Sequence, residues 1–227
     1  MTSLLSLLLA VACSKPEPAA PAQVLVYCTP EAAAHARRLA PLAAGRELIL
    51  APLPPGDILA ALEGTKAGDF VVFAGGGFAE KLASLQMVRF PALKVHTLGV
   101  CLVSAKPTTW DDITKSGLRL GSGTVGGTLD ASLPAELREA IAPQVVHRSG
   151  RGDELVRLVR LGSLDAALVW DSPPPAPDLP TLALPKAEAS CPLHIAALTT
   201  SRLPATEAKA LLEAWRTAFA AGEAPTE

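Results

Sequence analysis

The chain has 227 residues and a formal net charge of −2, from 20 basic and 22 acidic side chains. Hydrophobic residues make up 49% of the sequence, which supplies enough apolar side chains for one large domain or two small lobes. The charges are spread evenly, and no basic stripe alternates with aromatic residues. The composition therefore gives no support for nucleic-acid binding.

An apolar run over residues 4–12 ends abruptly at Cys13. The run is shorter than the about 20 apolar residues that a membrane-spanning helix needs, and it has the size of a signal-peptide core. Its end, Ala-Val-Ala-Cys at residues 10–13, resembles the bacterial lipobox, in which the cysteine is lipidated and becomes the mature N-terminus. We predict a signal peptide over 1–12 and a lipidated, Pro/Ala-rich tether over 13–22. Because no Lys or Arg precedes the run, a buried strand or helix at the start of a cytosolic domain is the alternative.

After the tether, short apolar runs alternate with segments of helical composition. The expected strands are residues 23–28, 47–53, 69–74, 145–146, 164–170 and 193–198, with a longer apolar segment at 97–105. The expected helices are residues 32–40, 58–63, 78–84, 129–141, 153–161 and 207–220. Short apolar runs are typical of strands buried on both faces of a sheet, and their alternation with helices indicates an α/β architecture with mainly parallel sheets.

Four loops that follow strands are candidates for ligand binding, because ligands of open α/β sheets bind where strands end and helices begin. In the first loop Thr29 is a suitable N-cap, with Pro30 and Glu31 in the first turn of the helix. Glycine-rich loops at residues 74–77 and 121–128 allow backbone N–H groups to approach an anion, unless the glycines only supply turn geometry. The candidate ligand-binding residues are Thr29, Gly75, Gly76, Ser122, Thr124, Gly126 and Trp170.

Motifs of common enzyme classes are absent from the sequence. The loop 121–128 lacks both the Gly-Lys-Ser/Thr ending of a P-loop and the third glycine of a dinucleotide-binding fingerprint, and no Gly-x-Ser-x-Gly elbow is present. No cysteine or histidine spacing is typical of a zinc site. An enzyme is supported only by Cys28 near a helix start, without a placed histidine partner. We therefore expect a non-enzymatic protein without a cofactor.

The order of four segments, residues 24–27, 68–74, 109–113 and 162–170, resembles that of the molybdate-binding group of type II periplasmic binding proteins. These proteins are the solute receptors of ABC importers. The resemblance implies two α/β lobes, here 23–95 with 185–227 and 96–184, joined by hinge segments with the ligand between them. It also places Cys101 and Cys191 on neighbouring strands, where a hinge disulfide is conceivable.

The sequence departs from this family at the positions that bind the oxyanion in its members. In this sequence, carboxylates lie at those positions or directly after them. Glu31, Asp57 and Asp171 would repel a bound oxyanion if they faced the ligand. They either point outward or bind a metal cation or an organic solute.

The sequence thus predicts a lipid-anchored, monomeric solute-binding component of an ABC importer. Its partners would be a small solute, with a molybdate- or tungstate-like oxyanion favoured, the membrane that holds its anchor, and a permease. It would act on the periplasmic side of the membrane or at the cell surface. A lipoprotein that keeps the fold as an interaction or sensor domain is the alternative.

Overall fold

The computed structural model describes residues 22–115, 117–172, 176–184 and 189–220. The predicted signal peptide, Cys13 and nearly all of the tether lie outside these residues. No helix in the described ranges is both long and apolar enough to cross a membrane.

The strands are β1 Gln23–Cys28, β2 Glu47–Pro52, β3 Phe70–Ala74, β4 Leu93–Ser104, β5 Leu120–Ser122, β6 Val145–Arg148, β7 Ala166–Trp170, β8 Thr181–Ala183 and β9 Ser190–Ala197. The α-helices are α1 Ala33–Arg37, α2 Pro55–Thr65, α3 Gly76–Ser84, α4 Trp110–Lys115, α5 Thr128–Ala131, α6 Ala135–Ile141, α7 Gly152–Arg160 and α8 Ala205–Ala220. Three 3-10 turns complete the set: η1 Pro30–Ala32, η2 Ala40–Leu42 and η3 Ala142–Gln144.

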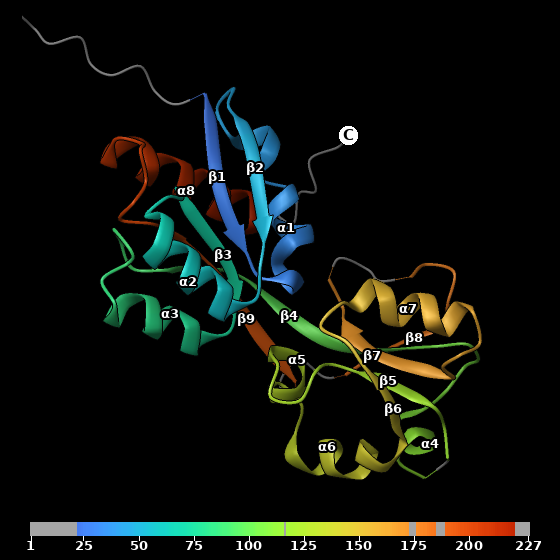
Figure 1. The fold of residues 1–227 in the computed structure, drawn as a ribbon. Helices are drawn as coiled ribbons and strands as arrows, with labels where there is room; N and C mark the ends of the chain where they lie inside the picture. The colour runs from blue at the N-terminus through green and yellow to red at the C-terminus, as the bar shows by residue number, and fades with distance from the viewer. Residues whose placement is uncertain (1–21, 116, 173–175, 185–188, 221–227) are drawn as a thin grey trace, which may run out of the picture.

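The strands follow one path, β2-β1-β3-β9-β4-β7-β5-β6, with β8 paired to β4. Strands β1, β2 and β3 pair in parallel, as do β5, β6 and β7. Strands β9 and β4 run antiparallel to their neighbours. The fold is the expected two-lobed α/β architecture. We call β1–β3 and β9 with α1–α3 and α8 the first lobe, and β5–β8 with α4–α7 the second lobe (Figure 1).

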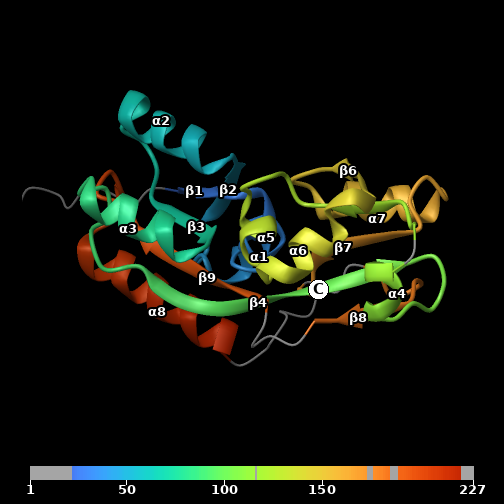
Figure 2. The same cartoon turned by 90° about the horizontal axis from the view of Figure 1, so that it is seen from below.

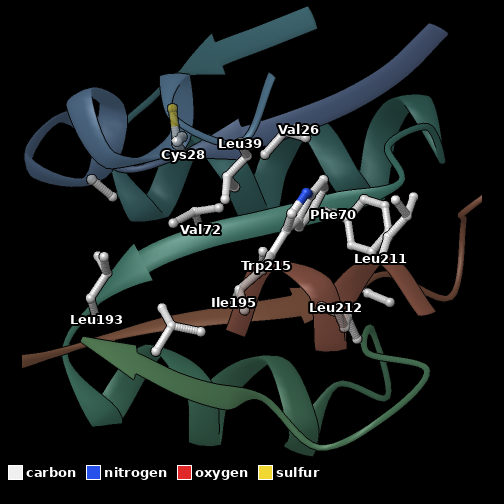
Figure 3. Packing of buried hydrophobic residues seen from close by; sticks show 14 of the residues in the cluster. Val26, Cys28, Leu39, Phe70, Val72, Leu193, Ile195, Leu211, Leu212 and Trp215 are labelled. Carbon is white, nitrogen blue, oxygen red and sulfur yellow. The ribbon is translucent and has the colours of Figure 1, made fainter. Parts of the chain in front are cut away.

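The first lobe buries both faces of its sheet, as the short apolar runs predict. In β3, Phe70 and Val72 point toward α8, where Trp215 packs edge-on against Phe70 at a centroid distance of 4.7 Å (Figure 3). The intervening Val71 and Phe73 pack on the opposite face with residues of α2 and α3. The alternation is the two-residue period of a strand with helices on both sides.

The second lobe repeats this arrangement around β4 and β7. Leu102 and Leu168 lie in a core with residues of α4, α5 and α6. The next residues along the two strands, Val103 and Val169, face a core completed by α7. Each lobe therefore has its own two-sided core.

Strand β4 connects the lobes. Its first half, up to Gly99, pairs with β9, and its second half, from Val100, pairs with β7 and β8. Figure 2 shows the strand passing continuously from one lobe to the other. At the transition, the backbone amide of Asp171 donates to Gly99 O at 2.8 Å, and the Gly99 amide donates to Asp171 Oδ1 at 2.8 Å.

The structure differs from the sequence analysis at three points. The helix expected over 129–141 is two helices, because Pro134 lacks an amide donor and disfavours helical geometry at the residue before it. Strand β8 was not expected, since it has three residues and no buried face. Cys101 and Cys191 are free thiols, because Cys191 pairs with Leu98 and Cys101 lies three residues further along β4, about 10 Å away in an extended strand.

Candidate functional site

The loop after β1 places a buried hydroxyl at the end of the first-lobe sheet. The Thr29 amide donates to Val72 O at 3.0 Å, which fixes the loop against β3. Thr29 occupies the N-cap of η1 as expected, but its side chain makes no capping hydrogen bond. Its Oγ1 is fully buried and has no hydrogen-bond partner among the described residues. A buried hydroxyl without a partner is unusual and calls for an explanation.

The loop after β3 requires glycine at its first position. Gly75 has φ +94°, a conformation that residues with a Cβ rarely adopt. Its amide donates to Pro192 O at 2.9 Å, so this N–H is used within the first lobe and is not available to a ligand. Gly76, the first residue of α3, is exposed.

The loop between β5 and α5 also contains a buried hydroxyl. Ser122 Oγ is buried and has no hydrogen-bond partner in the described part of the chain. Thr124 and Gly126 are exposed, and the Gly126 amide donates to Asp130 Oδ2 at 3.1 Å. The end of β5 and this loop therefore offer the hydroxyls of Ser122 and Thr124 as potential ligand donors. The Gly126 amide is already used in its hydrogen bond to Asp130.

An ion pair that the sequence did not reveal holds the β5–α5 loop. Arg148 Nη1 donates to Gly123 O at 3.0 Å and to Asp130 Oδ1 at 3.3 Å. Asp130 is buried, and the Arg148 guanidinium balances the charge of its carboxylate. Arg148 is the last residue of β6, and only the parallel pairing of β5 with β6 brings it to this loop.

Residues of η1 in the first lobe and of α5 in the second lobe are in contact. Thr128, the first residue of α5, donates from Oγ1 to Glu31 Oε1 of η1 at 2.9 Å. A Cβ placed on Gly75 would lie 3.8 Å from Thr128 Cγ2 and 4.0 Å from Cys191 Sγ. Helix α5 lies between the two lobes in both views (Figures 1 and 2). We call Glu31, Gly75, Thr128 and Cys191 the interlobe junction.

The thiols near the junction are protonated at neutral pH. Burial raises the pKa of Cys191 to about 11, with a further rise from the Glu31 carboxylate and an opposing effect of a hydrogen bond from Ser132. Burial likewise raises the pKa of Cys28 to about 11. Because the thiolate is the reactive form, these thiols are poor nucleophiles and give no support for thiol-based catalysis.

The other predicted site residues, Asp57, Asp171 and Trp170, lie in other elements of the fold. Asp57 is exposed in the first turn of α2, and Asp171 accepts the Gly99 amide where β4 crosses between the lobes. Trp170 is partly buried and packs against the cores of both lobes. Among the described residues, no group of three or more His, Cys, Asp and Glu is placed to hold a metal ion. The structure does not bring the three predicted carboxylates into one cluster.

A cavity of about 350 Å³ lies away from the junction, in the second lobe. Its lining residues are Cys101, Asp171, Ala176, Pro177, Leu179, Thr181 and Ala183. The Asp171 carboxylate there accepts the Gly99 amide, and the remaining lining is mostly apolar. The junction, in contrast, contains residues of η1 and α5, the elements that follow Thr29 and Ser122 along the chain. Because these two residues have buried hydroxyls without a partner in the described part of the chain, we take the junction as the candidate site.

No protein-family model matches the sequence, and no curated protein matches it. The fold, however, matches solved structures along most of the chain. The periplasmic molybdate-binding protein of Azotobacter vinelandii superposes with a TM-score of 0.65 at 14% identity, covering 87% of this chain and 92% of that one. The substrate-binding domain of a putative molybdenum ABC transporter from Clostridium difficile gives 0.62 at 12% identity, covering 87% and 91%.

Iron-bound HitA from Pseudomonas aeruginosa gives a TM-score of 0.63 at 15% identity, covering 88% of this chain and 84% of that one. The names of these three proteins indicate binding of different solutes, so the similarity extends to architecture and not to one ligand. The chain has the two-lobed fold of the type II periplasmic binding proteins.

Proposed function

We propose that this chain is the solute-binding component of an ABC importer and holds a small solute between its lobes, residues 23–95 with 185–227 and residues 96–184. The two buried hydroxyls without partners carry this proposal. Thr29 Oγ1 belongs to the first lobe and Ser122 Oγ to the second, and each lies where a strand ends. A polar group buried without a partner costs about 1–3 kcal/mol, and hydrogen bonds to a bound solute would recover that cost.

Binding would require the lobes to separate and close again, with no covalent step. In the described conformation Glu31 and Thr128 are in direct contact, so a solute would enter after that hydrogen bond breaks. The continuous strand β4 would serve as one hinge segment. The molybdate or tungstate expected from the sequence is supported by the hydroxyls and opposed by the Glu31 carboxylate.

Export and lipidation at Cys13 are part of the proposal and are supported by the sequence of residues 4–13. Expression of the full-length chain in a bacterium, followed by fractionation, tests them. The wild type should remain with the membranes and incorporate labelled fatty acid. The Cys13→Ser variant should do neither. Equal labelling of the two forms would contradict lipidation at this residue.

A ligand screen tests the solute-binding function itself. A solute present at a hundredfold excess over its Kd stabilises the folded state by about 2.7 kcal/mol, which raises Tm by about 5–11 °C for a chain of this size. Hits would be titrated by calorimetry against the wild type and the double variant Thr29→Val, Ser122→Ala. We expect the double variant to bind at least tenfold more weakly. A broad panel of anions, cations and amines without any hit would favour an interaction or sensor domain instead.

A further inference from the structure

Glu31 occupies a distinctive position among the acidic residues of the chain. It lies in the short turn η1 directly after β1, is partly buried, and touches the other lobe through Thr128. Its carboxylate also acts on the buried Cys191 thiol, which contributes to the raised pKa of that thiol. The carboxylate therefore faces the interlobe junction and not bulk solvent alone.

The charge of Glu31 is not balanced by an ion pair in the described residues. Arg148, at the end of β6 in the second lobe, is bound to Asp130 and to Gly123 O. Arg37 is exposed on α1 and acts on the Cys28 thiol, but it forms no ion pair with Glu31. Among the residues that the structure describes, Glu31 therefore has a hydrogen-bond partner in Thr128 but no ion-pair partner.

The unused hydrogen-bonding capacity of the Glu31 carboxylate also favours a solute that donates hydrogen bonds. An ionised carboxylate accepts about four hydrogen bonds and donates none. Among the described residues, the Glu31 carboxylate accepts one hydrogen bond, from the Thr128 hydroxyl. A solute entering here is best received if it brings N–H donors and positive charge. A fully ionised oxyanion instead places negative oxygens against a like charge in a partly desolvated site.

Resting on the proposed function, we propose that Glu31 is the residue that selects the solute, favouring small molecules with an ammonium or guanidinium group and excluding oxyanions. The hydroxyls of Thr29 and Ser122 would then bind the polar remainder of the solute. An organic cation fits the junction better than a metal ion. Hard metal ions take six or more oxygen ligands. Asp57 and Asp171 could supply such oxygens, but Asp57 is exposed on α2 and Asp171 accepts the Gly99 amide, so they do not form a cluster with Glu31.

The test uses the full-length chain as wild type, Glu31→Gln and Asp57→Asn. Glutamine keeps an oxygen that accepts the Thr128 hydroxyl, so Glu31→Gln removes the charge and preserves the interlobe hydrogen bond. Asp57→Asn removes one exposed charge from helix α2 of the first lobe and controls for general electrostatics. Calorimetric titrations with L-arginine, putrescine, molybdate and sulfate give the affinities.

We expect the wild type to bind at least one amine probe, and Glu31→Gln to weaken that binding at least tenfold. Molybdate or sulfate should bind Glu31→Gln at least tenfold more tightly than the wild type. Asp57→Asn should change each affinity less than threefold. Wild-type oxyanion binding that Glu31→Gln leaves unchanged or weakens would overturn the inference and leave the proposed function intact. If neither the wild type nor Glu31→Gln binds any of the four probes, both proposals lose their support.

Discussion

Replacing Thr29 by valine should stabilise the ligand-free protein and weaken solute binding at the same time. Valine has nearly the shape of threonine and replaces the hydroxyl by a methyl group. Because Thr29 Oγ1 is fully buried and lacks a partner in the described residues, its removal relieves a desolvation cost of about 1–3 kcal/mol. For a chain of this size each kcal/mol corresponds to about 2–4 °C in Tm, so Tm should rise by at least about 2 °C.

Thr200→Val is the matched control, because the same chemical change there removes a hydroxyl that is in use. Thr200 Oγ1 donates to Gly68 O at 2.8 Å, so valine should lower stability by about 1 kcal/mol. Urea unfolding of the wild type and both variants, without ligand, measures the two effects. A loss of stability in Thr29→Val as large as that in Thr200→Val would show that Thr29 is hydrogen-bonded in solution, which would refute the reasoning from an unpaired hydroxyl.

Four further predictions test the fold. Burial lowers the pKa of His35 below its ordinary value of 6.5, so the unfolded chain binds a proton at this residue at higher pH than the folded protein does. The free energy of unfolding should therefore fall as the pH drops below about 6.5, and urea midpoints measured across this range should depend less on pH in His35→Gln. Asp69→Asn should cost about 1–3 kcal/mol in urea unfolding, because the buried carboxylate accepts only from N–H and O–H donors and an amide places a donor against them. Gly68→Ala should cost more than about 2 kcal/mol by the same assay, because φ is +126° and the new Cβ would lie 2.7 Å from the Tyr27 ring. Burial raises the pKa of Cys101 to about 12, so its thiol should react slowly with thiol reagents until the protein unfolds, and mass spectrometry of the oxidised protein should show no bond from it to Cys191.

The fold was largely predictable from the sequence because its central strands, such as β3 and β7, are buried on both faces. Such strands appear as short apolar runs, and β1, β3 and β7 were expected within two residues of their observed bounds. Strand β8 gave no such signal, because its three residues are exposed or only partly buried. The break between α5 and α6 was missed because the apolar composition continues past Pro134, although the proline itself marks the boundary.

The site was predictable only as far as strand ends reveal it. Thr29 and Ser122 were predicted as candidates because each lies at the end of an expected strand or at the start of a glycine-rich loop. Thr128 as the partner of Glu31 was not predictable, since the two residues are 97 positions apart and meet only through the packing of one lobe on the other. The Arg148–Asp130 pair has the same origin, because it depends on the pairing of β5 with β6.

The contacts at the junction differ in kind from the cores on either side of it. Each lobe is held by its own apolar clusters, whereas Glu31 and Thr128 share a single partly buried hydrogen bond, worth about 0.5–1.5 kcal/mol. Breaking that bond to separate the loop ends would cost little compared with unfolding either lobe, and β4 would keep the lobes connected. A solute shifts such an equilibrium only by its preference for one state over the other. A ligand that satisfies Thr29, Ser122 and the remaining acceptor capacity of Glu31 together would favour the closed state by more than the Thr128 hydroxyl alone. Under the proposed function, the Glu31 carboxylate would weakly hold the empty protein closed through Thr128, and its remaining acceptor capacity would select the solute.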